Sequence, residues 1–232
     1  MITGSPRPRV AILGVGHVGS ALARILIDAG YEVDVAASGD PQRIQLIASV
    51  VMPGARARWA VDAVAGADIV ILAIPLHRFA GLDRSMLDGK LVIDSMNYWA
   101  PTDGTQSLFE DTTLTSSEIV QRELPGATVV KTFNHIGYHE MEEDRRPAGA
   151  IGRRALGVAS DDPDAASVVA SLIQDAGYDT VLVETLRDGV AFEPGGPVFG
   201  ARLDADAFVA AVDGVLGHQV ASSAPGGAEC AA

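Results

Sequence analysis

The chain opens on an apolar run that breaks into regularly spaced glycines and then becomes a helix-period pattern. Residues 10–13 form the apolar run after Arg9, and Gly14, Gly16 and Gly19 follow it with G-x-G-x-x-G spacing before the amphipathic segment 20–26. In such a pattern the first glycine turns the chain, the second lets a pyrophosphate approach the backbone, and the third lets the helix pack on the strand. The stretch therefore predicts a strand, a tight turn and a helix that together bind a dinucleotide.

The surrounding pattern supports this interpretation. Residues 30–37 predict a second strand after the helix, and the continuous apolar run 69–74 is typical of a strand buried on both faces. Residues 90–94 and 128–133 predict two further strands. We therefore expect an α/β fold with a Rossmann-type doubly wound parallel sheet, in which the amides at the helix start bind a diphosphate.

The last third of the chain changes in character. A strand over 154–160, a helix that starts at Asp162-Pro163 and a strand over 179–184 predict a small strand-helix-strand appendage. We expect a last short helix from about Asp204 to Val212. The predicted domains are an NADP-binding Rossmann domain over 1–150, a small C-terminal α/β extension over 151–215 and a flexible tail over 216–232.

Composition narrows the class of protein. The formal net charge of -13 argues against nucleic acid and anionic membrane surfaces, because their phosphates would repel the chain. Cys230 is the single cysteine, so an intrachain disulfide is excluded and a reducing compartment is expected. No apolar run is long enough for a signal peptide core or a membrane span. We expect a cytoplasmic protein that binds small molecules, and a homodimer, because the appendage offers an edge and a helix.

The loop after the second strand selects the nucleotide. Ala37 stands where NAD-selective sites place an acidic residue, which favours NADP. Ser38 could donate a hydrogen bond to a 2′-phosphate, and Arg43, one helical turn further on, could reach it. Asp40 places a carboxylate nearby, so NAD stays open as the alternative.

Polar residues follow the predicted strands at the edge where their carboxyl ends meet, which is where open parallel sheets bind ligands. Pro75 ends the run 69–74, and Asn134 and His135 follow the strand over 128–133. We expect Asn134 and His135 to bind a nicotinamide amide or a second ring. The His- and Glu-containing segment 137–146 lacks the ligand spacing of a metal site, so no metal is predicted.

Four stretches together resemble the family of deazaflavin (coenzyme F420)-dependent NADP oxidoreductases. They are residues 14–19, 71–75, 92–97 and 130–135, with the short appendage behind them. The first three occur in many dehydrogenases, whereas the fourth and the appendage narrow the choice to this family. The resemblance covers nearly the whole chain. It implies hydride transfer between NADP(H) and coenzyme F420 or a flavin-like acceptor, with the protein positioning the two rings.

The resemblance also implies roles for individual residues. Gly16, His17 and Val18 would cover the pyrophosphate, and Ser38 would bind the 2′-phosphate. The adenosine-side ribose would lie on Ile74 and Pro75, and the rings beside Asn134 and His135. The predicted catalytic residues are thus Asn134 and His135, and the predicted cofactor-binding residues are Gly14, Gly16, His17, Val18, Gly19, Ser38, Arg43, Ala73, Ile74, Pro75 and Asn97.

The chain departs from its relatives at two of these places. Gly39 and Asp40 stand where family members often carry arginines, and His135 stands where many carry threonine. Two other functions stay open. One is a non-catalytic NADP(H)-sensing module that binds a protein partner. The other is a dehydrogenase of small hydroxy acids or imines, whose relatives usually add a helical domain with a catalytic lysine, whereas this chain contains only Lys90 and Lys131.

Overall fold

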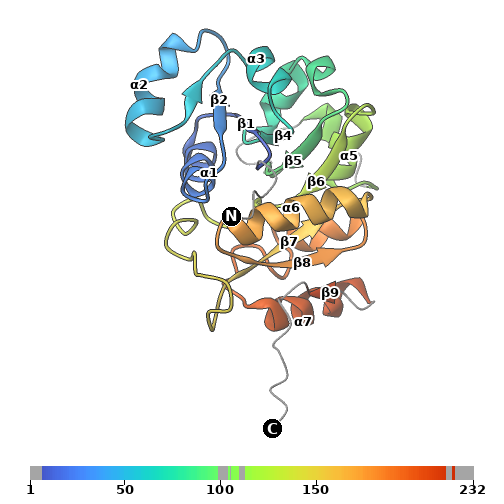
Figure 1. The fold of residues 1–232 in the computed structure, drawn as a ribbon. Coiled ribbons are helices and arrows are strands. Elements are labelled where there is room, and N and C mark those ends of the chain that lie inside the picture. The colour runs from blue at the N-terminus through green and yellow to red at the C-terminus, as the bar shows by residue number, and fades with distance from the viewer. Residues whose placement is uncertain (1–6, 99–103, 105, 110–112, 218–220, 223–232) are drawn as a thin grey trace.

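Nine strands form one sheet in the computed structural model, in the order β3-β2-β1-β4-β5-β6-β7-β8-β9 (Figure 1). The structure describes residues 7–98, 104, 106–109, 113–217 and 221–222. The strands are β1 (Val10–Leu13), β2 (Val33–Ala36), β3 (Arg56–Ala57), β4 (Ile69–Leu72), β5 (Leu91–Asp94), β6 (Thr128–Lys131), β7 (Ala155–Ala159), β8 (Asp179–Val183) and β9 (Ala221–Ser222).

Strands β1 to β6 are parallel, which confirms the predicted doubly wound Rossmann-type fold. β7 then pairs antiparallel with β6, β8 is parallel to β7, and β9 is antiparallel to β8. The carboxyl ends of the first six strands therefore share one edge. Because β7 runs in the opposite direction, its first residues lie beside the chain that leaves β6.

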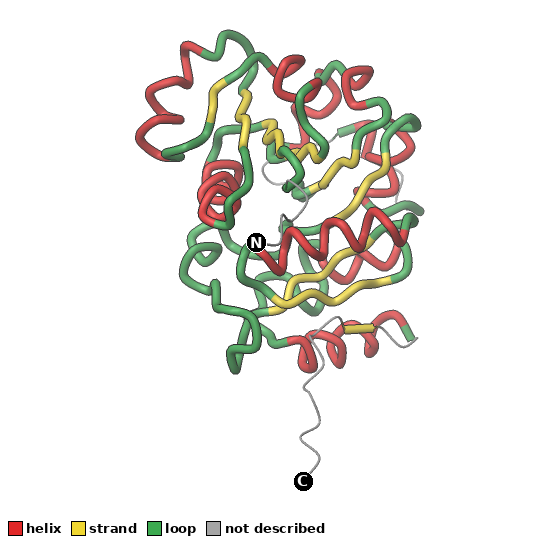
Figure 2. The backbone as a smooth tube through the Cα atoms, viewed as in Figure 1, coloured by secondary structure: helices red, strands yellow, loops and turns green. Residues whose placement is uncertain are grey.

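Helices cover both faces of the sheet (Figure 2). Side chains of α1, α2 and α6 pack in one core cluster, and those of α3, η1, η2 and α5 in another. The α-helices are α1 (His17–Asp28), α2 (Gln42–Val51), α3 (Ala60–Ala65), α5 (Ser116–Glu123), α6 (Pro163–Asp175) and α7 (Ala205–Leu216), and the 3₁₀ helices are η1 (Leu76–Gly81), η2 (Arg84–Leu87), η3 (Ser107–Phe109) and η4 (Arg187–Phe192). None of the helices in the described part of the chain has the length and apolar character needed to cross a bilayer.

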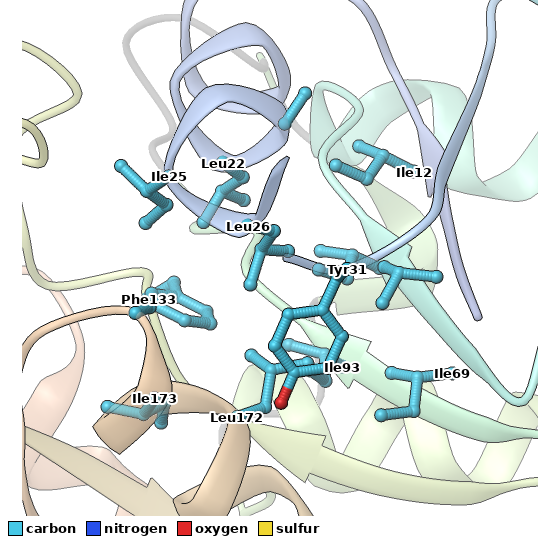
Figure 3. Close-up of a cluster of buried hydrophobic side chains, with 14 of the residues drawn as sticks. Ile12, Leu22, Ile25, Leu26, Tyr31, Ile69, Ile93, Phe133, Leu172 and Ile173 are labelled. Atoms are coloured by element: carbon cyan, nitrogen blue, oxygen red, sulfur yellow. The ribbon is translucent and has the colours of Figure 1, made fainter. Parts of the chain in front are cut away.

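Successive side chains along each strand pack alternately into the two core clusters on opposite faces of the sheet. Ile12 of β1 packs in the cluster with α1, whereas Leu13 packs in the cluster on the opposite face. Figure 3 shows the first cluster, where Leu26 of α1, Ile173 of α6 and Phe133 meet above the sheet. Each fully buried side chain of this kind contributes roughly 1.5–3 kcal/mol. Phe133 thus anchors the chain just after β6 between two helices.

The C-terminal unit continues the main sheet. The predicted helix of this unit begins where expected, because Asp162 Oδ1 accepts hydrogen bonds from the amides of Asp164 and Ala165, both at 3.0 Å. The last helix, α7, runs beyond the expected end to Leu216, where Gly217 in the left-handed conformation (φ 72°) closes it. The division into two domains stays a prediction, and most of the predicted flexible tail lies outside the described residues.

Most strands are shorter than their sequence patterns predicted; β2, for example, covers Val33–Ala36 rather than 30–37, and β4 ends at Leu72 rather than at residue 74. Residues 56–60 predicted a short third strand, but β3 covers only Arg56–Ala57, because Trp59 is already the N-cap of α3. β6 ends at Lys131 rather than Phe133, which has φ 61° and is the one described non-glycine residue with positive φ. The sequence of residues 102–113 predicted a flexible surface segment, and half of these residues lie outside the described part of the chain.

Candidate functional site

The glycine turn after β1 is packed too closely for any side chain at two of its three glycines. A Cβ on Gly14 would overlap the carbonyl oxygen of Ala73, and a Cβ on Gly19 would overlap the carbonyl oxygen of Gly14. Gly14 also has φ 120°, which side chains rarely adopt. A Cβ on Gly16, by contrast, would meet no atom within 4 Å. The turn is therefore tight inside and open on its outer side, which fits a diphosphate approaching the backbone.

The start of α1 is available to an anion. Gly16 is the N-cap residue of α1, so no side chain of the N-cap accepts a hydrogen bond from the first amides of the helix. The first turn also contains no acidic residue. The ring of His17 stacks on the exposed ring of Tyr138, with centroids 4.7 Å apart and planes at 15°. Free amides at a helix start attract phosphate through directed hydrogen bonds and the helix dipole. The predicted residues Gly16, His17 and Val18 thus surround a suitable diphosphate position.

Three neighbouring cavities that share lining residues follow the carboxyl edge of the sheet. The outer cavity, of about 680 Å³, lies between the end of β2 and the segments η1 and η2. The central cavity, of about 400 Å³, lies over the start of α1, and the inner cavity, of about 320 Å³, lies beside residues 133–137. Ile74 and Pro75 line both the outer and the central cavity, and Val18 and Asn97 line both the central and the inner one. The three volumes lie within the range of about 300–1,000 Å³ that is usual for small-molecule sites.

The outer cavity contains one of the two residues predicted to bind a 2′-phosphate. Ser38 lines it, whereas Arg43 lies exposed on α2 and is not part of its lining. Trp59 and Arg78 line it as well, although the sequence pattern had not indicated either. Arg78 lies three residues after Pro75, so its place just beyond a strand end was the signal that could have identified it.

The predicted residue Ala73 lines the central cavity, and so does Tyr138, which the sequence analysis did not single out. Tyr138 follows Asn134 and His135 in the same loop, and only its stacking on His17 shows that this loop covers the start of α1.

Two asparagine side chains connect the ends of β5 and β6 at the inner cavity. Asn134 Nδ2 donates to Asn97 Oδ1 at 3.0 Å and to the carbonyl oxygen of Phe192 at 2.8 Å. Asn97 Nδ2 donates in turn to the carbonyl oxygen of Asn134 at 2.6 Å. Asn134 is only 5% exposed, whereas Asn97 is half-buried and lines both cavities. Asn97 therefore offers its remaining hydrogen-bonding positions to a ligand, and Asn134 orients it.

His135 faces the protein interior. Its Nε2 accepts a hydrogen bond from the amide of Gly157 at 3.1 Å, so the ring proton belongs on Nδ1, which lies 3.2 Å from Asn134 Oδ1. Burial lowers the pKa of His135 to about 3, and the charges of Arg154 and Lys131 act in the same direction. The neutral ring donates its Nδ1 proton to Asn134 Oδ1 and so helps to orient the side-chain amide of Asn134. The geometry favours a supporting role for His135, and the catalytic assignment of both residues stays a prediction.

Both lysines of the chain are engaged away from the cavities. Lys131 Nζ lies 3.2 Å from Asp94 Oδ2 and donates to the carbonyl oxygen of Met96 at 2.6 Å, and both side chains of the ion pair are buried. Lys90 Nζ donates to the carbonyl oxygen of Ala67 at 2.8 Å. Neither lysine lines one of the three cavities. Within the described residues no group of three His, Cys, Asp or Glu side chains could hold a metal ion.

Comparison with known proteins agrees with this geometry. The family model for coenzyme F420-dependent NADP oxidoreductases matches residues 9–98. A hypothetical protein from Sinorhizobium meliloti is 31% identical, with 83% of this chain and 93% of that chain covered and a TM-score of 0.72. A proposed F420-dependent NADP reductase from Arthrobacter sp. FB24 is 28% identical over 75% of this chain and 83% of its own, with a TM-score of 0.61.

Residues 9–98 of this chain thus match the family of coenzyme F420-dependent NADP oxidoreductases. The resemblance noted in the sequence is thereby confirmed, and the family is one of NAD(P)-dependent oxidoreductases. An imine reductase from Pseudomonas sp. shares the fold at 21% identity and a TM-score of 0.51, over 74% of this chain and 54% of its own. Among curated proteins, none matches this chain.

Proposed function

We propose that this protein binds NADP(H) along the three cavities and transfers hydride between its nicotinamide and a deazaflavin or flavin-like acceptor. The observation that carries the proposal is the row of adjacent cavities that runs from the end of β2, over the uncapped start of α1, to Asn97 and Asn134. An extended dinucleotide laid along that path places adenosine in the outer cavity, its diphosphate over Gly16 and its nicotinamide near Asn97.

The inner cavity suits an exchange between two rings. NADPH supplies a hydride when it is bound, and the acceptor ring takes this hydride together with a proton from water. The residues of the chain position the rings. Asn97 and Asn134 form a hydrogen-bonded frame at one side of the cavity, and Phe199 lines it too. Neither lysine nor a protonated His135 is available there as an acid, which supports transfer between rings over a dehydrogenase mechanism that needs a lysine.

The test is a mixture of purified protein, NADPH and oxidised coenzyme F420, followed by the absorbance of the deazaflavin. We expect bleaching that matches the NADPH consumed, above a protein-free control. FMN and FAD in parallel reactions identify which ring is accepted. If the protein leaves all three acceptors oxidised, hydride transfer to this class of acceptor is wrong.

A non-catalytic NADP(H)-sensing module is the second candidate, because the exposed rings of Tyr138 and Trp59 lie at the mouths of the nucleotide cavities and could report occupancy to a partner. Tight binding of NADPH without reduction of any acceptor would favour it. Cytoplasmic location and a homodimer remain part of the proposal, and light scattering of the purified protein checks the dimer.

A further inference from the structure

The outer cavity contains one positively charged side chain among its described lining residues, and that side chain is Arg78. No described residue forms an ion pair with its guanidinium group. In a chain with a formal net charge of -13, an unpaired arginine that lines a cavity is a natural position for an anion. The guanidinium group suits phosphate in particular, because it can donate two parallel hydrogen bonds to phosphate oxygens.

The backbone under Arg78 is held firmly. Its amide donates to the carbonyl oxygen of Pro75 at 2.8 Å, which starts the 3₁₀ helix η1. Leu76 and Phe79, on either side of it, are buried in the core at 2% and 0% exposure. Packing of Leu76 and Phe79 fixes the backbone between them, while the side chain of Arg78 stays exposed at the cavity. Because the backbone at Arg78 is already fixed, binding a phosphate there costs little further backbone entropy.

Two carboxylates from segments that border the outer cavity accept hydrogen bonds from residues close to them in sequence. Asp83 lines the cavity, but its Oδ1 accepts from the amide of Ser85 at 3.2 Å and from its hydroxyl at 2.7 Å. Asp40 does not line the cavity, and its Oδ1 accepts from the amide of Gln42 at 2.8 Å. Neither carboxylate neutralises Arg78 through an ion pair.

The loop after β2 supplies the other half of a phosphate site. Ser38 and Gly39 line the same cavity as Arg78, and a Cβ at Gly39 would meet nothing within 4 Å. Gly39 has φ 99°, and the space where its Cβ would lie is empty, so a ligand can approach its backbone. Arg43, the cation that the sequence suggested, is the exposed second residue of α2 and does not line the cavity.

We propose that Arg78 binds the phosphate monoester at the 2′ position of adenosine, with Ser38 as a second donor, and that Arg78 rather than Arg43 determines the preference for NADP over NAD. This inference rests on the proposed dinucleotide site. The 2′-phosphate would then be bound mainly by the segment after β4, which lines the same cavity as the loop after β2.

The experiment compares 2′,5′-ADP with 5′-AMP, two probes that differ only by the 2′-phosphate, by calorimetry on the full chain. For Arg78→Gln we expect the affinity ratio of the two probes to fall by about 10- to 100-fold, as is usual when a hydrogen-bonded charge is lost. For Arg43→Gln we expect a change below about threefold, typical of an exposed charge. Arg7→Gln controls for the loss of one positive charge, since Arg7 precedes β1 and pairs with Asp175.

Each outcome decides between the two arginines or rejects the site. An unchanged ratio in Arg78→Gln, or a larger loss in Arg43→Gln, overturns the inference but leaves the dinucleotide site standing. Equal weakening of both probes in Arg78→Gln also overturns it, because Arg78 would then contact the shared adenosine. If the wild-type protein binds neither probe nor NADPH, the proposed function falls together with the inference. Arg78→Lys should restore part of the ratio, because the charge returns without the planar pair of donors.

Discussion

The side chains at the outer and the inner end of the row of cavities differ in how tightly the rest of the chain holds them. At the outer end, Trp59 is 49% exposed and Arg78 has no ion-pair partner among the described residues. At the inner end, Asn134 and His135 are buried and each makes hydrogen bonds to other parts of the chain. Side chains at the outer end can therefore change without disturbing the fold, whereas those at the inner end belong to both fold and site. Substitutions should alter affinity at the outer end, and turnover and stability at the inner end.

The largest effect is expected at the turn that joins the two ends. Gly14→Ala would place a Cβ against the carbonyl oxygen of Ala73 at a backbone φ of 120°. We expect the free energy of unfolding to fall by about 3 kcal/mol or more, from overlap and backbone strain together. Thermal unfolding measures it. Gly16→Ala is the matched control, because its Cβ has no neighbour within 4 Å, so it should stay folded while its affinity for NADPH falls. Equal melting temperatures for the two variants would contradict the close packing at Gly14.

Asn134→Ala tests the inner end directly. The change leaves Asn97 Oδ1 and the carbonyl oxygen of Phe192 without their donor. Because a ring misplaced by about 1 Å can cost about 100-fold in rate, we expect kcat to fall by about 10- to 100-fold. The Kd of NADPH should change by less than about threefold, because the adenosine and diphosphate contacts are intact. The contrast with the outer end breaks down if Asn134→Ala weakens NADPH binding and leaves kcat unchanged.

The buried, neutral His135 should make the free energy of unfolding depend on pH. Its pKa is lowered to about 3 in the folded protein by burial, whereas an unfolded histidine titrates near its usual pKa of about 6.5. The unfolded state therefore binds the extra proton first, and stability is lost as the pH falls from about 6.5 toward about 3, by up to about 1.4 kcal/mol per pH unit.

The measurement is chemical unfolding at pH 7 and pH 5. His135→Gln keeps an acceptor for the amide of Gly157 but has no titrating ring, so its stability should vary less between the two values. A wild-type slope no steeper than that of His135→Gln would show that this histidine is not buried in its neutral form.

The smallest effect concerns Trp59 at the outer end. We expect Trp59→Ala to weaken binding of 2′,5′-ADP by about 3- to 10-fold, since an aromatic stack contributes about 0.5–1.5 kcal/mol. The chain contains two tryptophans, Trp59 and Trp99, so a Trp99→Phe background isolates the fluorescence of Trp59. Binding of 2′,5′-ADP should quench that emission. Emission that stays constant at saturation would place the adenine elsewhere in the cavity.

The sequence predicted the local features of both ends. The glycine spacing at 14–19, the apolar strands and the cap at Asp162 all agree with the structure. These features depend on residues that are neighbours in the chain, on backbone geometry and on burial, so periodicity and composition express them. The same patterns predicted the shared carboxyl edge of the strands, which the parallel pairing confirms, and a diphosphate position over Gly16, which stays a prediction.

Tertiary structure alone decided which side chains meet. Asn97 and Asn134 are 37 residues apart, and His135 reaches the amide of Gly157, 22 residues further on, because β7 runs antiparallel to β6. Arg78 reaches the outer cavity through the short turn η1, whereas Arg43 lies on an exposed helix face. Such contacts depend on strand direction, register and helix rotation, which combine distant parts of the chain. A local pattern contains no information on them, and for that reason the buried role of His135 and the place of Arg78 emerged only from the fold.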